Sequence, residues 1–248
     1  MKRIQFFFAS LTVFAALLTS CNREDVGPLQ EGQQTFALTG FDRLDMGSGF
    51  DVNVQPGATF SIVAKGDQRN LDDLDVVVRN GTLTAEYRTY RNRKFATTFT
   101  ITMPTLRAVK FSGGVHATLK GFANAASLDL DLSGGTHTTF EGLASRTNVQ
   151  LSGGSKLELK APQVTTGDDT VTGRIDELLV DASGASNVQA FYYAASEVNV
   201  KTSGASHAEI TATQSLVAEA SGASKIRYRG NPAKVNQNAS GASKIERD

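Results

Sequence analysis

The three histidines of the chain fall at one position of a repeated pattern and are its first candidates for chemistry. His116, His137 and His207 each lie four residues after the serine of a Ser-Gly motif. Imidazole binds transition metals and titrates near neutral pH, so His116 and His137, on adjacent copies, are candidate ligand contacts. The other four copies hold Lys or Asn there, at Lys156, Asn187, Lys225 and Lys244. No carboxylate or third adjacent histidine completes a ligand set, so we expect a solvated polar column and no bound metal.

A second candidate is the segment YRTYRNRK, which interleaves aromatic and basic side chains. Guanidinium groups beside aromatic rings can bind a polyanion such as an acidic glycan or a lipid headgroup. Its candidate ligand contacts are Tyr87, Arg88, Tyr90, Arg91 and Arg93. The alternative, which we favour, is a hairpin tip whose charges protect a strand edge.

A third candidate is a small acidic cluster, Asp168 and Asp169, with Asp176 and Glu177 nearby. Enzymes that cleave polysaccharides use such acids or a bound calcium ion. The acids here are few and no long loops accompany them, so we favour a turn. We expect no catalytic residues and no cofactor.

Two other motifs are interpreted as structural. Gly47-Ser48-Gly49 resembles a phosphate loop, but no helix follows it, so we exclude that function. The aromatic run Phe191-Tyr192-Tyr193 favours packing at a corner over a platform for sugars.

The elements that position these residues are seven copies of a Ser-Gly-Gly/Ala motif, beginning at serines 112, 133, 152, 183, 203, 221 and 240. A repeat near twenty residues is typical of a solenoid. Glycine suits a sharp corner because it adopts positive φ without a Cβ clash. The expected corner residues are Gly113, Gly134, Gly153, Gly184, Gly204, Gly222 and Gly241.

Residues on both sides of each corner alternate between apolar and polar, which predicts a strand before it and a strand after it. We therefore predict an all-β fold: a parallel β-helix or β-solenoid with seven short rungs over residues 109–248. The wider spacing after Ser152 predicts an inserted hairpin at about residues 163–173. The last copy turns polar at Gln237 and Arg247, as expected of a terminal rung.

Residues 36–108 are expected to be a β-rich segment that precedes the rungs. Their apolar runs are separated by Gly, Pro, Asn and Asp, which favour turns. Asn80-Gly81 is the strongest hairpin signal in the chain. The segment GDQRNLDDL has room for one short helical turn.

The beginning of the chain predicts a lipoprotein address. Lys2 and Arg3 precede an apolar run, which indicates a signal peptide over residues 1–20. Cys21, the single cysteine, ends this run and is the expected lipidation site, with residues 21–35 as a flexible tether. Without Lys2 and Arg3, 23 basic and 25 acidic side chains remain, a net charge of −2 that predicts no nucleic-acid binding.

Several segments resemble the head GIN domain family in order. They are GFDRLDMGSGFDVNVQPG, FSIVAKGDQRNLDDLDVVVRNGTLTAEY and FTITMPTLRAVKFSGG, followed by the Ser-Gly copies, and they cover roughly residues 36–247. That family is described as a putative autotransporter-adhesin head and is common in Bacteroidetes lipoproteins. The resemblance implies a solenoid-type all-β fold outside the cytoplasm and supplies no agreed catalytic residues.

We therefore predict a non-enzymatic outer-membrane lipoprotein, exposed at the cell surface or facing the periplasm, that binds a glycan, matrix or protein ligand. Its membrane partner is reached through Cys21, and its oligomeric state stays open. One alternative is a polysaccharide-active enzyme. The other is a structural or envelope-stress lipoprotein without an external ligand.

Overall fold

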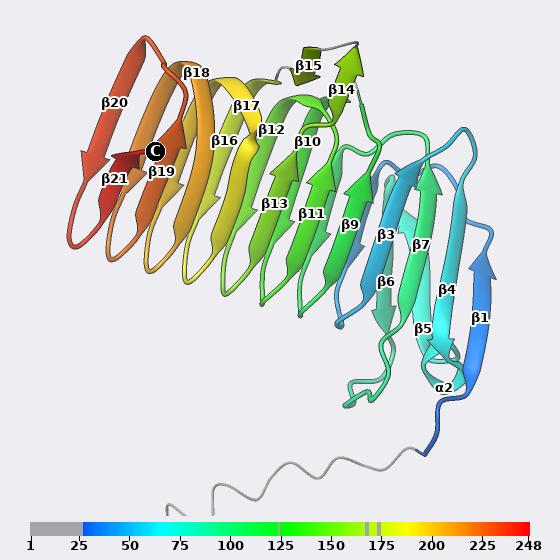
Figure 1. Cartoon of the computed structure of the whole chain (residues 1–248). Helices are drawn as coiled ribbons and strands as arrows, with labels where there is room; N and C mark the ends of the chain where they lie inside the picture. The colour runs from blue at the N-terminus through cyan, green and yellow to red at the C-terminus, as the bar shows by residue number, and fades with distance from the viewer. Residues whose placement is uncertain (1–26, 124, 167–168, 173–174) are drawn as a thin grey trace, which may run out of the picture.

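The computed structural model describes residues 27–123, 125–166, 169–172 and 175–248 (Figure 1). The expected signal peptide, Cys21 and Asp168 lie outside these residues. Within them the chain is almost entirely β-strand, and its helical part is the short turn α2 (Gln68–Leu71). The prediction of an all-β fold is confirmed.

Two layers of parallel strands form most of the molecule. The descending layer, whose strands run toward a corner, consists of β6 (Thr82–Tyr87), β2 (Arg43–Met46), β8 (Ala108–Phe111), β10 (Ala125–Leu132), β12 (Ala144–Leu151), β16 (Ile175–Ala182), the second halves of β17 (Asn187–Thr202) and β18 (His207–Ala220), and β20 (Lys234–Ala239).

The ascending layer, whose strands leave a corner, consists of β7 (Thr98–Met103), β3 (Asp51–Pro56), β9 (His116–Lys120), β11 (His137–Glu141), β13 (Lys156–Lys160), the first halves of β17 and β18, β19 (Lys225–Arg229) and β21 (Lys244–Arg247). Antiparallel strands extend both layers at one end. The ascending layer continues from β7 to β4 (Ser61–Asp67) and then to β1 (Glu31–Phe36), and the descending layer continues from β6 to β5 (Leu74–Arg79).

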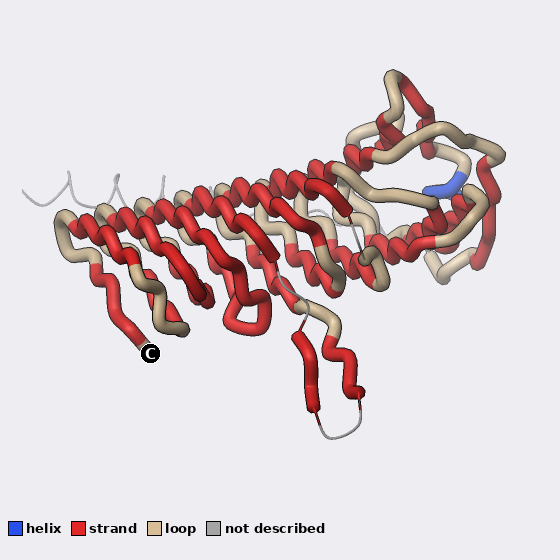
Figure 2. The backbone as a smooth tube through the Cα atoms, turned by 90° about the horizontal axis from the view of Figure 1, so that it is seen from above, coloured by secondary structure: helices blue, strands red, loops and turns tan. Residues whose placement is uncertain are grey.

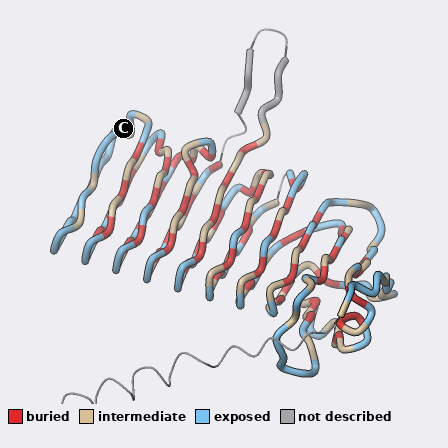
Figure 3. Tube along the Cα trace, turned by 60° about the horizontal axis from the view of Figure 1, so that its bottom comes forward, coloured by how far each residue is buried: buried red, intermediate tan, exposed pale blue. Residues whose placement is uncertain are grey.

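The hydrophobic core lies between the two layers. Apolar side chains alternate with outward polar ones along each strand, as the buried and exposed segments in Figure 3 show. Leu130 and Val149 of the descending layer and Leu157 and Phe140 of the ascending layer are all buried. The inward positions predicted from the repeat are thus the core positions in the first six copies. In the seventh copy, β20 and β21 carry no buried residue.

Each corner stacks on the corner before it through backbone hydrogen bonds. The amide of Ala205 donates to the carbonyl of Gly184 at 2.7 Å, and the amide of Ala223 donates to that of Gly204 at 2.8 Å. A Cβ atom on Gly204 would lie 2.6 Å from the carbonyl oxygen of Gly184, and Gly204 has a φ of +69°. The close stacking and the left-handed backbone both require glycine at this position.

In four copies a second serine, three residues after the first, hydrogen-bonds back to the corner, whereas the equivalent hydroxyl of Ser206 has no hydrogen-bond partner among the described residues. Ser186 is buried, and its hydroxyl donates to the carbonyl oxygen of Ser183 at 2.7 Å. Ser224 makes the same bond to Ser221 at 2.8 Å. The small hydroxyl satisfies a carbonyl that the tight turn leaves without a ladder partner, which explains serine at this buried position.

The segment Gly47–Gly49 is a further corner, which lacks the Ser-Gly-Gly/Ala motif of the other seven. Its strands pair with those of the first Ser-Gly copy, so that Asp51 lies opposite His116. Ser48 has a φ of 62°, close to the 63° of Gly113 in the next corner. Serine takes the left-handed position here, so the sequence motif is lost while the geometry is kept.

Strands from both sides of the expected division at residues 108 and 109 pair within one stack. Strands β2 and β3 lie inside the stack, between β6 and β7 on one side and β8 and β9 on the other. One core cluster runs from Phe41 to Tyr228. The chain therefore enters the stack with β2 and β3, builds one end of it with β4 to β7, and returns with β8 and β9 beside β2 and β3.

The expected tether also ends earlier than residue 35. Strand β1 begins at Glu31 and pairs antiparallel with β4, from Glu31 opposite Asp67 to Phe36 opposite Ile62. The ladder bonds are made by the backbone, so the polar side chains of this stretch do not prevent strand formation.

The residues inserted between the third and fourth Ser-Gly copies form a hairpin outside the two layers. Strands β14 (Gln163–Thr166) and β15 (Asp169–Thr172) pair antiparallel with each other, whereas β12 pairs directly with β16 and β13 with β17. The insertion thus adds no strand to either layer. It leaves the stack at the edge opposite the corners (Figure 1) and extends sideways from it (Figure 2).

We predict that Gly204→Ala lowers the free energy of unfolding by at least about 2 kcal/mol, because its Cβ meets the preceding corner at positive φ. The matched control is Gly154→Ala, at a position outside the left-handed region with no atom within 4 Å of the added Cβ. Its stability is expected to change by less than about 0.5 kcal/mol. Urea unfolding measures both, and equal losses in the two variants would contradict this account of the corners.

Candidate functional site

His116 and His137 lie side by side on the outward face of the ascending layer. Their rings are stacked, with centroids 5.3 Å apart and planes inclined by 10°. The strand register continues the column with Asp51 on one side and Lys156 on the other. His116 Nδ1 lies 3.9 Å from Asp51 Oδ1, so a carboxylate and two imidazoles meet at one end of a basic column.

The two histidines lie in a hollow that we call the histidine groove. Its volume is about 550 Å³, and it runs across β7, β3, β9, β11 and β13. Its polar lining includes Asp51, Asn53, His116, Thr118, His137 and Lys156. Hydroxyl, amide and imidazole groups in a shallow open hollow can donate to and accept from a polar ligand without removing it from water.

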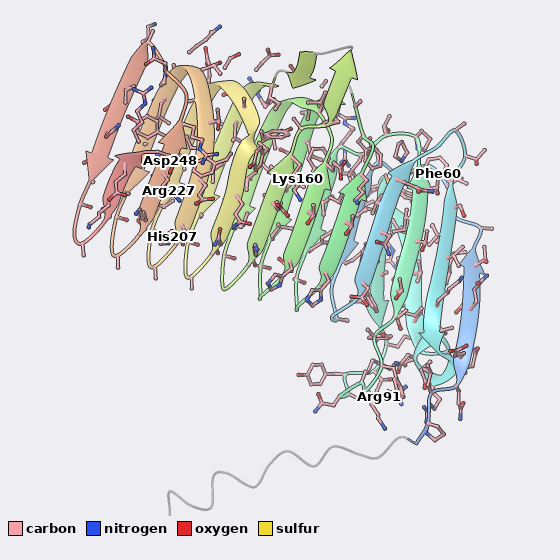
Figure 4. All side chains as sticks on the ribbon, in the orientation of Figure 1. Phe60, Arg91, Lys160, His207, Arg227 and Asp248 are labelled. Carbon is pink, nitrogen blue, oxygen red and sulfur yellow. The ribbon has the colours of Figure 1, made fainter. Side chains whose placement is uncertain are left out.

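The groove lacks the donor set of a metal centre. Within the part of the chain that the structure describes, no three His, Cys, Asp or Glu side chains are placed to share an ion. His207 occupies the same column but lies between Asn187 and Lys225, two strands away from Lys156 (Figure 4). The structure thus brings together two of the three histidines and separates the third.

A second outward column lies beside the histidine column. It changes from neutral to charged along the stack: Asn53, Thr118, Thr139, Glu158, Gln189, Glu209, Arg227 and Glu246. Near its charged end the side chains pair with one another, as Arg227 does with Glu209 at 2.9 Å. The polar side chains of this column that do not pair with a neighbouring column residue therefore lie mostly at the groove.

Asp51 and Asn53 are groove residues that the sequence analysis missed. The alternation in GFDVNV matches that in GVHATL after the first Ser-Gly motif, and aligning the two would have placed Asp51 with His116. The signal was hidden because serine replaces glycine in the corner before it.

The basic segment divides into a structural base and an exposed tip. Arg93 is the centre of the base, with a side chain only 9% exposed. It forms an ion pair with Asp73, donates to Asn70 Oδ1 at 2.8 Å, and lies 3.4 Å from the centroid of the Tyr87 ring. Arg93 and Tyr87, both predicted ligand contacts, are therefore used inside the protein.

Tyr87 connects this base to the core. Its hydroxyl donates to Thr97 Oγ1 at 2.7 Å, and its ring packs edge-on against Phe50 with centroids 4.9 Å apart. Burial raises the pKa of Tyr87 above its ordinary value, and the bond to Thr97 opposes this. Burial also acts to raise the pKa of Asp73, but hydrogen bonds from Arg93 and Thr89 outweigh it and lower that pKa.

The remaining residues of the segment form the tip. Tyr90 is fully exposed, at 105% of its reference area. Arg88 and Arg91 are exposed as well and reach back to backbone carbonyls, Arg88 to Asp72 at 3.3 Å and Arg91 to Arg69 at 2.9 Å. These three side chains keep their outer surfaces for contacts with another molecule.

Two of the acids considered for catalysis, Asp176 and Glu177, are held in surface pairs. Asp176 accepts a hydrogen bond from Ser145, and Glu177 pairs with Arg146 at 2.5 Å. These side chains lie across neighbouring strands of the descending layer, β12 and β16, away from the histidine groove.

The aromatic run is divided between core and surface. Tyr193 is buried, and its hydroxyl lies 2.8 Å from Thr147 Oγ1. Arg229 lies 4.0 Å from the centroid of the Phe191 ring, and Tyr192 is 64% exposed. Packing at a corner describes Tyr193 and Phe191, whereas Tyr192 stands free of the core.

We predict that Arg93→Ala lowers the free energy of unfolding by at least about 2 kcal/mol, because it leaves the largely buried Asp73 carboxylate without its cation. Arg91→Ala, which removes an exposed guanidinium from the same segment, is expected to change it by less than about 0.5 kcal/mol. Thermal and urea unfolding of both variants measure this difference. Indistinguishable midpoints would contradict the division into base and tip.

Comparison with known proteins identifies the family. The model of the family described as "Putative auto-transporter adhesin, head GIN domain" matches residues 40–232. No curated protein matches the chain.

Solved structures share the fold at low sequence identity. A putative adhesin from Bacteroides fragilis is 19% identical, with a TM-score of 0.78, and the match covers 88% of this chain and 97% of that one. A putative adhesin from Parabacteroides merdae is 21% identical, with a TM-score of 0.65 and coverage of 88% and 96%. A putative lipid binding protein from Parabacteroides distasonis is 14% identical, with a TM-score of 0.67 and coverage of 88% and 96%.

These structures agree with the two-layered β fold described above, and the family match spans both the first corner and most of the Ser-Gly copies. The resemblance inferred from the sequence is confirmed: the chain belongs to the family of the putative auto-transporter adhesin head GIN domain.

Proposed function

We propose that this protein is a lipid-anchored, non-catalytic β-solenoid of the bacterial cell envelope, which binds a polar ligand at the histidine groove. The observation that carries this proposal is the groove itself, where two stacked imidazoles, a carboxylate and several hydroxyl and amide groups face solvent on a rigid sheet.

The solenoid assignment is supported by the pairing of the strands. Equivalent residues of successive copies lie opposite each other in both layers, and successive corners are joined by backbone hydrogen bonds. Such a stack holds its outward columns in fixed register, which suits recognition through many weak contacts along one face.

The ligand class follows from the lining of the groove. Thr118, Thr139 and Asn53 offer hydroxyl and amide groups, while His116 and His137 add flat rings. This combination matches a carbohydrate, whose hydroxyl groups exchange hydrogen bonds and whose ring faces pack on flat side chains. The groove holds one cation, Lys156, against the carboxylates of Asp51 and Glu158, so its charge favours a neutral glycan over an acidic one.

A binding role agrees better than catalysis with the described acids. Asp176 and Glu177 are engaged by Ser145 and Arg146, and neither reaches the groove. The family is described as adhesin-like rather than as an enzyme.

The anchor and the location are proposed from the sequence and the relatives. Cys21 follows a basic start and an apolar run, the arrangement of a lipoprotein signal. No helix among the described residues has the length and apolar character needed to span a bilayer. Similar structures are named putative adhesins, and one is named a putative lipid binding protein, which supports a role at the cell envelope.

We predict that His116→Ala combined with His137→Ala weakens glycan binding at least about tenfold, because both rings and their hydrogen-bonding groups are removed from the groove. The control is His207→Ala, on the same column but outside the groove. The measurement is binding of the mature chain to an array of acidic and neutral glycans, with detection of released products.

Three outcomes contradict the proposal in different ways. Equal loss in the His207→Ala variant would assign binding to the whole column rather than to the groove. Unchanged binding in the double variant would remove the groove from the function. Released product would favour the alternative of a polysaccharide-active enzyme.

A further inference from the structure

The exposed tip of the basic segment lies at the edge where the described chain begins. The loop between β6 and β7 replaces a tight corner, and it projects from the same edge as the Ser-Gly corners (Figures 1 and 4). The start of β1 and the short helix α2 lie at that edge too. The start of the described chain and the tip are therefore neighbours at one end of the stack.

Hydrogen bonds fix this neighbourhood. The side chain of Arg69 on α2 donates to the carbonyl of Pro28 at 3.1 Å, and the amide of Gln68 donates to Gln30 at 2.7 Å. Arg91 of the tip donates to the carbonyl of Arg69 at 2.9 Å. The first described residues are thus held on α2, and α2 is in turn held by the loop.

The base of the loop is rigid and its tip is open. Arg93 joins the loop to Asp73 and Asn70, and Asn70 Nδ2 donates to the carbonyl of Phe95 at 2.9 Å. Tyr90, between these anchored residues, has its whole side chain in solvent. A fully exposed tyrosine on a well-braced loop is a feature that internal packing does not explain.

The tip is also the cationic part of this end of the molecule. Residues 67–73 and 88–94 together carry five basic and three acidic side chains, a net charge of +2. Two of the acids, Asp67 and Asp73, are paired with Arg69 and Arg93. The exposed cations Arg88, Arg91 and Lys94 lie within four residues of Tyr90 in the sequence, and residues 88–94 contain no acidic residue.

We infer that Tyr90, with Arg88, Arg91 and Lys94, docks on the anionic headgroups of the membrane to which the chain is anchored. This inference rests on the proposed lipid anchor at Cys21. The seven residue-to-residue steps from Cys21 to Pro28 can span at most about 25 Å, so an anchored chain keeps the tip close to the bilayer.

The chemistry of the tip matches an interface between lipid and water. Tyrosine is enriched there because its ring enters the apolar boundary while its hydroxyl stays with the headgroups. Arginine and lysine beside it are attracted to phosphate groups, bidentately in the case of arginine. Such contacts are individually weak, and they orient a protein that a lipid chain already holds at the surface.

Docking at this edge would also set the orientation of the rest of the molecule relative to the membrane. The inserted hairpin β14–β15 begins at the opposite edge (Figure 1) and extends sideways from the stack (Figure 2), and the histidine groove lies on the face between the two edges. A docked tip therefore leaves the groove open to ligands beside the membrane and keeps the base of the hairpin at the edge far from it.

The chain has no tryptophan, so a single Tyr90→Trp substitution gives a fluorescent reporter without background. The full-length lipidated protein is added to vesicles of phosphatidylcholine and phosphatidylglycerol with brominated acyl chains. We expect blue-shifted emission and at least about twofold quenching of Trp fluorescence, because the ring enters the interface. The control is Tyr192→Trp, an exposed position in the register shift between Ala190 and Ala195 that divides the two halves of β17, whose emission should stay unchanged.

A further variant tests the charges. Adding Arg88→Ser and Arg91→Ser to Tyr90→Trp should remove most of the quenching, since neither arginine belongs to the structural base. Quenching that survives this change, or that is equal in vesicles of phosphatidylcholine alone, would overturn recognition of anionic headgroups.

Flotation of the same vesicles separates this inference from the proposed anchor. Protein that floats with unquenched, unshifted fluorescence at position 90 overturns the docking and keeps the anchor. Protein that does not float overturns the anchor, and its fluorescence then reports the tip alone: a blue shift supports docking, and no shift overturns it. A shift caused by a soluble acidic polysaccharide but not by vesicles would assign the tip to a glycan and overturn the membrane partner.

Discussion

The close stacking of corner on corner is the constraint on which the rest of the structure depends. Strands in a sheet lie about 4.8 Å apart, so each turn of the chain must fit within that spacing. At Gly204 the corner meets this limit with no side chain, a positive φ and a hydrogen bond to the next corner. A bulkier corner would force neighbouring coils apart and break the ladders of both layers.

Because the corners stack in register, every residue position becomes a column. The apolar columns meet between the layers and form one continuous core, while the outward columns remain in solvent. Because of this arrangement, histidine at the same position of two successive copies gives a pair of stacked rings. A surface built in this way can change its chemistry along the stack without changing its shape.

Departures from the regular corner account for the other surface features. Where β6 passes into β7, a longer loop takes the place of the corner and carries the arginine-rich segment. Arg93 is drawn inward by Asp73 and Tyr87, and this anchoring leaves Tyr90 and Arg91 outside. Between β13 and β16 the chain leaves the layers as a hairpin, and the ladders close beneath it.

The sequence by itself determined the all-β fold, the corner glycines of the seven Ser-Gly copies and the inward and outward faces of their strands. These properties are local, because the repeated Ser-Gly motif sets the turns, and the two-residue alternation sets the inward and outward faces of the strands, without distant contacts. Only the tertiary structure decided that the chain doubles back to place β2 and β3 inside the stack, which brings Asp51 to His116. It likewise separated Arg93 from Arg91, since the partly buried Asp73, from another segment, forms an ion pair with one of two similar arginines. Pairing between distant strands and ion pairs across a fold depend on which surfaces meet, and a linear pattern does not contain that information.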